Sequence, residues 1–246
     1  MPRGRCHLAV LSALHQRLRI RHRDIAALAD RCLPDFIGGA VAPDGLRYVG
    51  RLGKRATHFY TEDEPETWGQ SVAGMFRAYP ELADADRLRE SDRVLVMGYI
   101  SHLTVDEAFR DVVTCQLHGI ADWRPVVQGL WSLVDELPVG YANVLAEIDR
   151  FCREGRVGPI DRGMVGEFLD TIRPWVMADD PLAVEQAFLE MIHRPMPEEA
   201  ARQQLEAKRR EGVARMDDVR RAAFVREAVR MGMGEIVRYL DGGYCR

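Results

Sequence analysis

Residues 91 to 117, SDRVLVMGYISHLTVDEAFRDVVTCQL, decide the fold class of this chain. Ser91 followed by Asp92 is typical of a helix start, and the apolar residues that follow recur at helical spacing over a length that crosses a small domain. Elsewhere there is no sustained two-residue alternation and no Asn-Gly turn of the kind that joins paired strands. The sequence therefore predicts an all-α protein built around one long central helix.

Helical periodicity and helix-breaking residues divide the rest of the chain. We expect further helices over residues 6 to 19, 24 to 32 (with Asp24 as N-cap), 124 to 135, 138 to 153, 161 to 172 and 180 to 193, and over 198 to 240 as either two helices or one helix bent at Gly212. Two prolines and three glycines, Pro34, Gly38, Gly39, Pro43 and Gly45, predict a loop from residue 34 to about residue 58. The expected architecture is a single all-helical domain over residues 1 to 246, with a metal-binding half (1 to 120), a divergent helical half (121 to 246) and a helical C-terminal extension.

Composition narrows the classes of partner. With 34 Lys and Arg against 38 Asp and Glu, the net charge of -4 gives no basic excess for binding nucleic acid. The apolar run near the N-terminus is too short and too polar for a signal peptide or a membrane span, and five scattered cysteines without a C-x-x-C pair indicate free thiols. We expect a cytoplasmic protein, and the preference for Arg over Lys suggests a GC-rich bacterial genome.

His102 and Asp106 lie four residues apart in the long helix, so both side chains project from one face and can bind one ion together. Spacing alone favours the more common alternative, a hydrogen-bonded pair on a helix surface. Apolar neighbours on most sides of the helix favour the metal site, because a carboxylate buried without a partner is costly. Two further fragments carry ligand-type residues: AVAPDG (40 to 45) with Asp44, and THF (57 to 59) with His58. Their simpler interpretations are a turn-forming Asp and a core His.

Taken together, GGAVAPD (38 to 44), THF (57 to 59) and GYISHLTVDEAF (98 to 109) resemble the zinc-dependent phospholipase C family, which is related to the helical P1/S1-type nucleases. The resemblance covers about the first half of the chain and implies the multi-helix bundle of that family. It also implies that Asp44, His58, His102 and Asp106 bind one zinc ion, with Asp106 able to bridge to a second. A ligand histidine in the first helix would be His7, or otherwise His15, two turns later.

The chain also departs from the family. Secreted members use a free amino terminus as a ligand, but here Met1 and five further residues precede His7, and no later His-x-x-x-Glu is found. The segment DEAFRD (106 to 111) is similar to the D-x-x-W-R-D of intracellular relatives, with Phe109 in place of Trp. One or two ions are therefore expected, zinc first, with iron or manganese as alternatives.

Several residues near the expected site have more than one possible role. Glu107 and Asp111 are candidates for carboxylates that support the ligands, although Asp111 pairs equally well with Arg110. Arg110 is a candidate for binding a substrate anion, while a solvated ion pair is the commoner role of a helical Arg. His118, His193 and His22 have weaker claims, and either of the first two could complete a second metal site by folding back. The four tryptophans are expected in the core or in pocket walls.

These residues predict a metal-dependent hydrolase acting on a phosphate ester or another small ester-like substrate, with Asp44 or Asp106 accepting the proton. One alternative is a tailoring enzyme that uses the ion as a Lewis acid for cyclisation, elimination or another hydrolysis. A second is a non-catalytic protein in which the ion only holds the helices together. In this second alternative, residues 198 to 240 bind a partner. A homodimer through the C-terminal helices is possible whichever of these functions the protein has.

Overall fold

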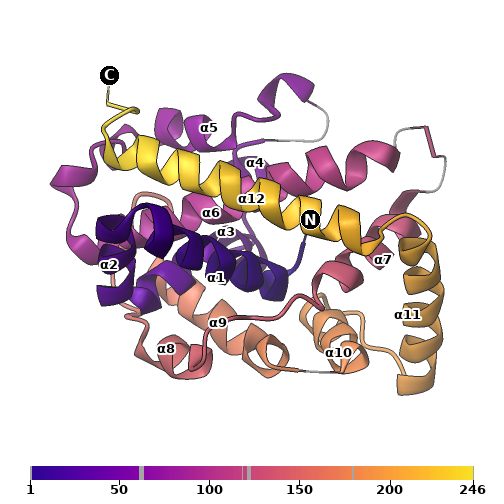
Figure 1. Cartoon of the computed structure of the whole chain (residues 1–246). Coiled ribbons are helices and arrows are strands. Elements are labelled where there is room, and N and C mark those ends of the chain that lie inside the picture. The colour runs from indigo at the N-terminus through magenta and orange to yellow at the C-terminus, as the bar shows by residue number, and fades with distance from the viewer. Residues whose placement is uncertain (1, 61–63, 118, 121–122, 179, 246) are drawn as a thin grey trace.

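The computed structural model describes residues 2–60, 64–117, 119–120, 123–178 and 180–245 (Figure 1). The described chain is all-helical apart from one two-stranded antiparallel hairpin, β1 (Arg156–Val157) and β2 (Ile160–Asp161). The α-helices are α1 (Gly4–Arg21), α2 (Arg23–Arg31), α3 (Leu33–Tyr48), α4 (Lys54–His58), α5 (Ser71–Ala78), α6 (Glu90–Val112), α7 (Trp123–Val134), α8 (Val144–Arg150), α9 (Arg162–Val176), α10 (Pro181–Met191), α11 (Glu198–Val213) and α12 (Asp218–Leu240). Four short 3₁₀ turns join them: η1 (Pro65–Thr67), η2 (Pro80–Leu82), η3 (Ala85–Arg87) and η4 (Thr114–Leu117). The predicted all-α class is confirmed.

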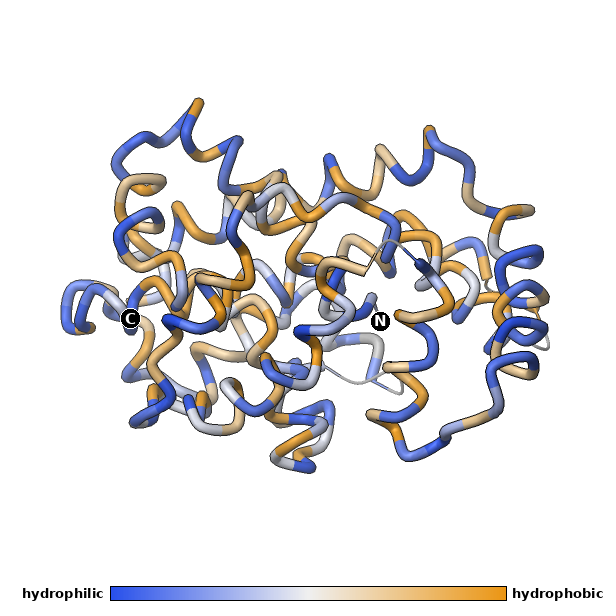
Figure 2. Tube along the Cα trace, turned by 90° about the horizontal axis from the view of Figure 1, so that it is seen from below, coloured by the Kyte–Doolittle hydropathy of each residue, from blue (hydrophilic) through white to orange (hydrophobic). Residues whose placement is uncertain are grey.

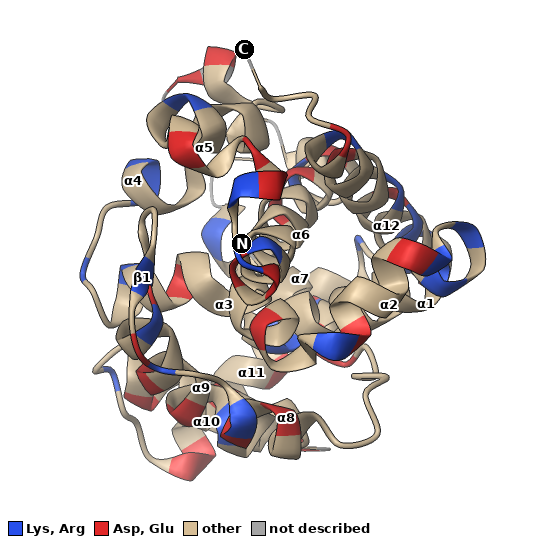
Figure 3. Cartoon of the chain, turned by 90° about the vertical axis from the view of Figure 1, so that its left-hand side faces the viewer, with Lys and Arg blue, Asp and Glu red and all other residues tan. Residues whose placement is uncertain are grey.

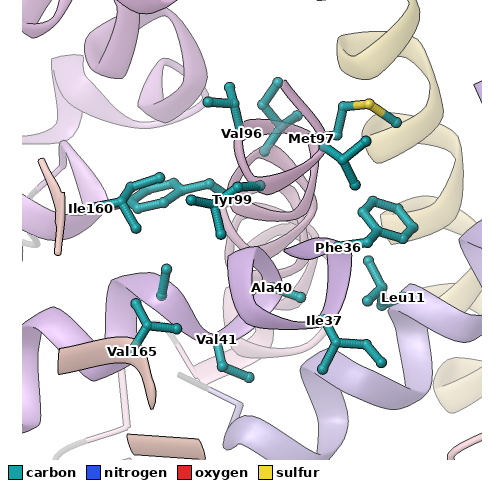
Figure 4. Close-up of a cluster of buried hydrophobic side chains, with 14 of the residues drawn as sticks. Leu11, Phe36, Ile37, Ala40, Val41, Val96, Met97, Tyr99, Ile160 and Val165 are labelled. Carbon is teal, nitrogen blue, oxygen red and sulfur yellow. The ribbon is translucent and has the colours of Figure 1, made fainter. Parts of the chain in front are cut away.

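The long helix α6 lies at the centre of the bundle. Its residues from Val94 to Phe109 are all buried, and it packs against α3 on one side and α12 on another. The close-up in Figure 4 shows apolar side chains of α3, among them Phe36 and Val41, and of α6, among them Val96 and Tyr99, which belong to one core cluster. A helix that is apolar on nearly every face must be covered on every face, and the surrounding helices do this.

Two glycines allow α3 and α6 to approach at backbone distance. A Cβ atom on Gly39 would lie 2.9 Å from the Cα of Gly98, and one on Gly98 would lie 2.3 Å from the carbonyl oxygen of Phe36. No residue larger than glycine fits either position without moving a backbone. This crossing fixes the spacing of the two helices that carry most of the site.

The predicted loop from residue 34 to residue 58 is wrong, because residues 33 to 48 form α3. Pro34 stands in the first helical turn, where a missing N–H costs nothing, and Pro43 removes only one hydrogen bond within the helix. The glycines that suggested a loop serve close packing instead, since α3 is buried from Pro34 to Leu46. Tertiary packing outweighs the low intrinsic helix preference of this segment.

Other helix boundaries differ more modestly. The central helix begins at Glu90 with Arg89 as its N-cap, not at Ser91, and α2 has His22 at the N-cap position in place of Asp24. The helix expected over 138 to 153 is shorter, because α8 covers only Val144–Arg150. The segment 198 to 240 forms two helices, and the Asp217 side chain caps the second by accepting from the Arg220 N–H at 2.7 Å.

The second half of the chain packs on more than one side of the first, because α9 and α8 lie against α3 while α12 lies against α6. α11 packs on α7, while α12 lies along α6 and α1 (Figure 1). The outer helix α11 is hydrophilic over most of its length (Figure 2), and basic and acidic residues alternate over the outer helices seen in Figure 3. All five cysteines are free thiols, as predicted. None of the described helices has the length and apolar character that crossing a membrane requires.

Candidate metal centre

Five ligand-type side chains converge inside the bundle, each less than about 5% exposed: His7 from α1, Asp44 from α3, His58 from α4, and His102 and Asp106 from α6. Two overlapping groups have ligand atoms within 4.8 Å of one another, His7 with Asp44 and His102, and His58 with His102 and Asp106. The structure thus brings together all the residues that the resemblance marked as ligands. Asp44 lies within α3 and not on a tight loop.

The orientation of His102 is fixed by the backbone of α3. Its Nδ1 lies 2.8 Å from the carbonyl oxygen of Ala40, so Nδ1 is the protonated nitrogen and Nε2 is left free for a ligand. Its ring stacks on that of His7, with centroids 3.7 Å apart. The close approach of α3 and α6 at Gly39 and Gly98 allows the hydrogen bond between His102 and Ala40, because it brings the Ala40 carbonyl to the central helix.

His58 is held by two residues that sequence reasoning did not single out. The hydroxyl of Thr57 lies 2.7 Å from His58 Nδ1, and the Tyr99 hydroxyl donates to the carbonyl oxygen of Thr57 at 2.5 Å. His58 Nε2 therefore points to the interior, 3.2 Å from His102 Nε2. Groups that fix the second nitrogen of a histidine are usual around metal sites, because they set the ring orientation. No motif spacing indicated Tyr99, since its role depends on the packing of α6 against α4.

The carboxylates face the imidazoles without bonding to them. Nε2 of His7 lies 3.7 Å from Asp106 Oδ1, and Nε2 of His58 lies 3.6 Å from Asp106 Oδ2 and 3.7 Å from Asp44 Oδ1. Within the described part of the chain, both oxygens of Asp106, Oδ1 of Asp44 and both ring nitrogens of His7 are buried without a hydrogen-bond partner. Such atoms are normally satisfied in native proteins. A cation bound among them would supply the missing partner.

Burial dominates the acid–base chemistry of the cluster. It raises the pKa of Asp44 to about 6 and that of Asp106 to about 7, and it lowers the pKa of His102 to about 3. Burial also lowers the pKa values of His7 and His58 well below the usual range, and the neighbouring His102 adds to both shifts. Neutral imidazoles beside carboxyls with raised pKa values form a site in which a divalent cation would replace the protons that the carboxyls hold at mildly acidic pH.

A cavity of about 630 Å³ adjoins the cluster and is lined by both ligand carboxylates, Asp44 and Asp106. Arg47 and Lys54 line the same cavity, and their positive charges lower the pKa values of both carboxyls against the larger effect of burial. Sequence reasoning missed both cations, which follow Asp44 by three and ten residues and carry no motif of their own. A small molecule in the cavity can therefore reach the two carboxylates and the two cations together.

The candidate supporting residues have separate roles. Asp111 is exposed and pairs with Arg110 at 2.8 Å, which is one of the two roles expected for it. Arg110 also lines the cavity, with its guanidinium 5.4 Å from the Trp68 ring centre. Glu107 is buried and accepts a hydrogen bond from the backbone N–H of Ser71 at 2.8 Å, so it ties α6 to α5.

The other histidines that the structure describes do not join the cluster. His15 is buried two turns along α1 from His7, where its Nε2 pairs with Asp30 at 3.2 Å, so His7 is the first-helix residue that faces the site. His193 is exposed after the end of α10, and His22 lies between α1 and α2. Neither belongs to a possible ligand group among the described residues. His118 lies outside the described residues.

Comparison of the chain with protein-family models, with characterised proteins and with solved structures finds no match.

Proposed function

We propose that this protein is a metal-dependent hydrolase, most readily a zinc enzyme, that cleaves a phosphate ester bound in the cavity beside Asp44 and Asp106. The observation that carries the proposal is the set of five buried His and Asp side chains whose unpaired ligand atoms meet at a cavity lined by Arg47 and Lys54. Imidazole and carboxylate are the ligands that zinc accepts, while iron and manganese are compatible with the same set.

We infer that the centre holds a single ion. His102 belongs to both candidate ligand groups, but its Nδ1 is taken by the Ala40 carbonyl, so only Nε2 can bind a metal. One imidazole nitrogen binds one ion, and two ions would have to compete for it. Two carboxylates and three neutral imidazoles together also balance the charge of one divalent cation. This agrees with the absence from the sequence of the further ligands that resembling multi-zinc enzymes use.

Each residue has a role in the proposed reaction. When bound, the metal would polarise the phosphoryl group and lower the pKa of a coordinated water. An oxygen of Asp44 or Asp106 not engaged by the metal would accept a proton from that water, since both carboxyls line the cavity. Arg47 and Lys54 attract the anionic substrate, and Arg110 contacts it further along the cavity.

Two alternative functions, a purely structural ion and a Lewis-acid tailoring enzyme, are less well supported. A purely structural ion is expected in a closed site, whereas here two ligand carboxylates line a cavity of about 630 Å³. A Lewis-acid tailoring enzyme is favoured by aromatic cavity walls but would not require cations beside the metal ligands. The cations favour an anionic substrate and so support the hydrolase proposal. The resemblance to zinc-dependent phospholipases C, a cytoplasmic location and a homodimer through the C-terminal helices stay predictions.

Cleavage of p-nitrophenyl esters by metal-reconstituted protein tests the proposal. We expect zinc-dependent turnover of bis-p-nitrophenyl phosphate or p-nitrophenyl phosphate, lost by at least about a hundredfold in Asp106→Asn. Asp111→Asn is the matched control, because Asp111 is the same residue type on the same helix but exposed and paired with Arg110. Fully loaded protein that cleaves neither ester, or equal losses in the two variants, would contradict the proposal.

A further inference from the structure

All four tryptophans of the chain, Trp68, Trp123, Trp131 and Trp175, line the cavity beside the metal ligands. The first and the last, Trp68 and Trp175, are more than a hundred residues apart in the sequence, and Trp123 is 40% exposed. Core packing alone therefore does not explain why the four indoles lie around one cavity. Phenylalanines complete the aromatic wall: Phe109, Phe168 and Phe188. Aromatic faces of this kind bind planar apolar groups by stacking and by excluding water.

The acidic part of the cavity wall lies at the metal ligands. Asp44 and Asp106 line the cavity together with Arg47 and Lys54, whose charges lower the pKa values of both carboxyls, while the arginines at residues 3, 110 and 124 add positive charge elsewhere in the wall. The α7 part of the wall contributes two indoles and Val127 beside Arg124 and Gln128. An occupant that matches the metal ligands with their cations and also the aromatic wall carries an anionic group and a planar apolar group.

The size of the cavity limits the apolar part to one group. A volume of about 630 Å³ is in the range of pockets that enclose a single drug-sized molecule. Walls contributed by α6, α7, α9 and α10 line the space, which is partly open to solvent. The volume suits one planar group better than two long acyl chains.

We propose that the substrate is a phosphate ester of a single aromatic alcohol, with its planar group held among the tryptophans and its phosphate beside Arg47 and Lys54. This inference rests on the proposed hydrolase function and specifies its substrate. In the reaction, the oxygen of water bonds to phosphorus while the bond from phosphorus to the ester oxygen breaks. One proton of the water ends on the released alcohol, and no redox partner is needed.

Calorimetric titration with two phosphonates measures the apolar contribution apart from catalysis. The probes are 1-naphthylmethylphosphonate and methylphosphonate, which share the head group and contain a P–C bond that the hydrolase does not cleave. We expect the zinc-loaded protein to bind the naphthyl compound at least ten times more tightly. Affinities within threefold of each other would overturn the inference and leave the proposed function standing.

Two variants locate the binding in the cavity. Thr114→Trp fills a lining position on the part-exposed turn η4, and Trp123→Ala removes an indole that is 40% exposed, so neither change disturbs the main core. We expect both to reduce the preference for the naphthyl compound at least threefold, with little effect on methylphosphonate. Val219→Ala, at an exposed apolar residue of α12 outside the cavity wall, is the control and should change neither. A preference unchanged in both cavity variants would overturn the inference.

Turnover separates the two proposals. The kcat/KM for 1-naphthyl phosphate is compared with that for methyl phosphate after both are divided by the uncatalysed rates, which corrects for the different leaving groups. A metal-dependent value at least ten times higher for the naphthyl ester supports both the hydrolase and the aromatic substrate. Comparable cleavage of a diacyl phospholipid in mixed micelles would overturn the single-group inference. Tight naphthyl binding without cleavage of any ester would support the ligand class and overturn the hydrolase.

Discussion

Asp106 contributes two buried oxygens with no hydrogen-bond partner among the described residues, which makes it the most informative single side chain of the centre. Its pKa is raised to about 7 and that of Asp44 to about 6, mainly because burial penalises the charged form. Such carboxyls hold protons well above the pH at which exposed Asp loses them. A metal ion must displace those protons in order to bind.

Proton release on metal binding follows from these pKa values. The folded-state values lie above the ordinary value of about 3.9, so without metal both carboxyls are mostly protonated at pH 5.5 and mostly ionised at pH 8. We expect zinc binding to release roughly one to two protons from them at pH 5.5 and to become tighter as the pH rises to about 7. The three histidines add little, since their lowered pKa values keep them neutral throughout.

Calorimetry in two buffers of different ionisation enthalpy counts these protons. In Asp106→Asn the number released at pH 5.5 should fall by roughly one, in proportion to the carboxyl removed. A proton count at pH 5.5 that Asp106→Asn does not change would contradict the assignment of Asp106 as a ligand.

Most ligand-type residues of the centre could be predicted from the sequence. The four-residue spacing of His102 and Asp106 on a helix was sufficient to predict that they share a face, and the resembling motifs pointed to Asp44, His58 and His7. Arg47, Lys54 and Tyr99 could not be predicted in the same way. Each acts through neighbours distant in the chain, and no spacing rule connects them to the ligands.

Among the secondary-structure elements, the contact between α3 and α6 positions the centre. The two helices carry Asp44, His102 and Asp106, and the Ala40 carbonyl of one orients the His102 ring of the other. Composition predicted a loop in place of α3, because prolines and glycines usually end helices. The glycine at residue 39 faces another at residue 98, and only the folded structure reveals that pairing.

Gly98→Ala tests the crossing. The added Cβ would lie 2.3 Å from the Phe36 carbonyl oxygen, so the helices must separate, and we expect a loss of about 3 kcal/mol in the free energy of unfolding together with weaker zinc binding. Gly234→Ala in the exposed face of α12 is the matched control, because nothing lies within 4 Å of the added atom. It should stabilise the protein by about 0.5–1 kcal/mol. Urea denaturation measures both, and equal effects would contradict the role of the crossing.

For the whole molecule, a buried ion cluster joins the N-terminal segment to the second half of the chain. Glu185 of α10 accepts from Arg3 at 2.5 Å and from Lys208 of α11 at 3.0 Å. Arg3 in turn lies 3.5 Å from Asp135, and its carbonyl oxygen accepts from the His7 N–H. The divergent half therefore anchors the start of α1, from which His7 enters the centre. Sequence reasoning treated the two halves separately and did not foresee this link.

Glu185→Gln measures the strength of that link. The change leaves the buried Arg3 and the partly buried Lys208 facing a neutral amide, and we expect the free energy of unfolding to fall by about 3 kcal/mol. Asp170→Asn, which weakens the exposed pair with Arg153, should cost less than about 1 kcal/mol. Chemical denaturation of both variants checks the difference, and a loss in Glu185→Gln no larger than in Asp170→Asn would show that the cluster does not hold the halves together.

The metal content of the purified protein is the most direct measurement of all. After incubation with zinc and removal of unbound ions, elemental analysis should find about one equivalent in the parent protein and in Asp111→Asn, and a small fraction of that in a variant with both His102→Ala and Asp106→Asn. Two or more equivalents would contradict the single-ion centre. Less than about a tenth of an equivalent of zinc, iron or manganese after reconstitution would contradict the metal centre itself.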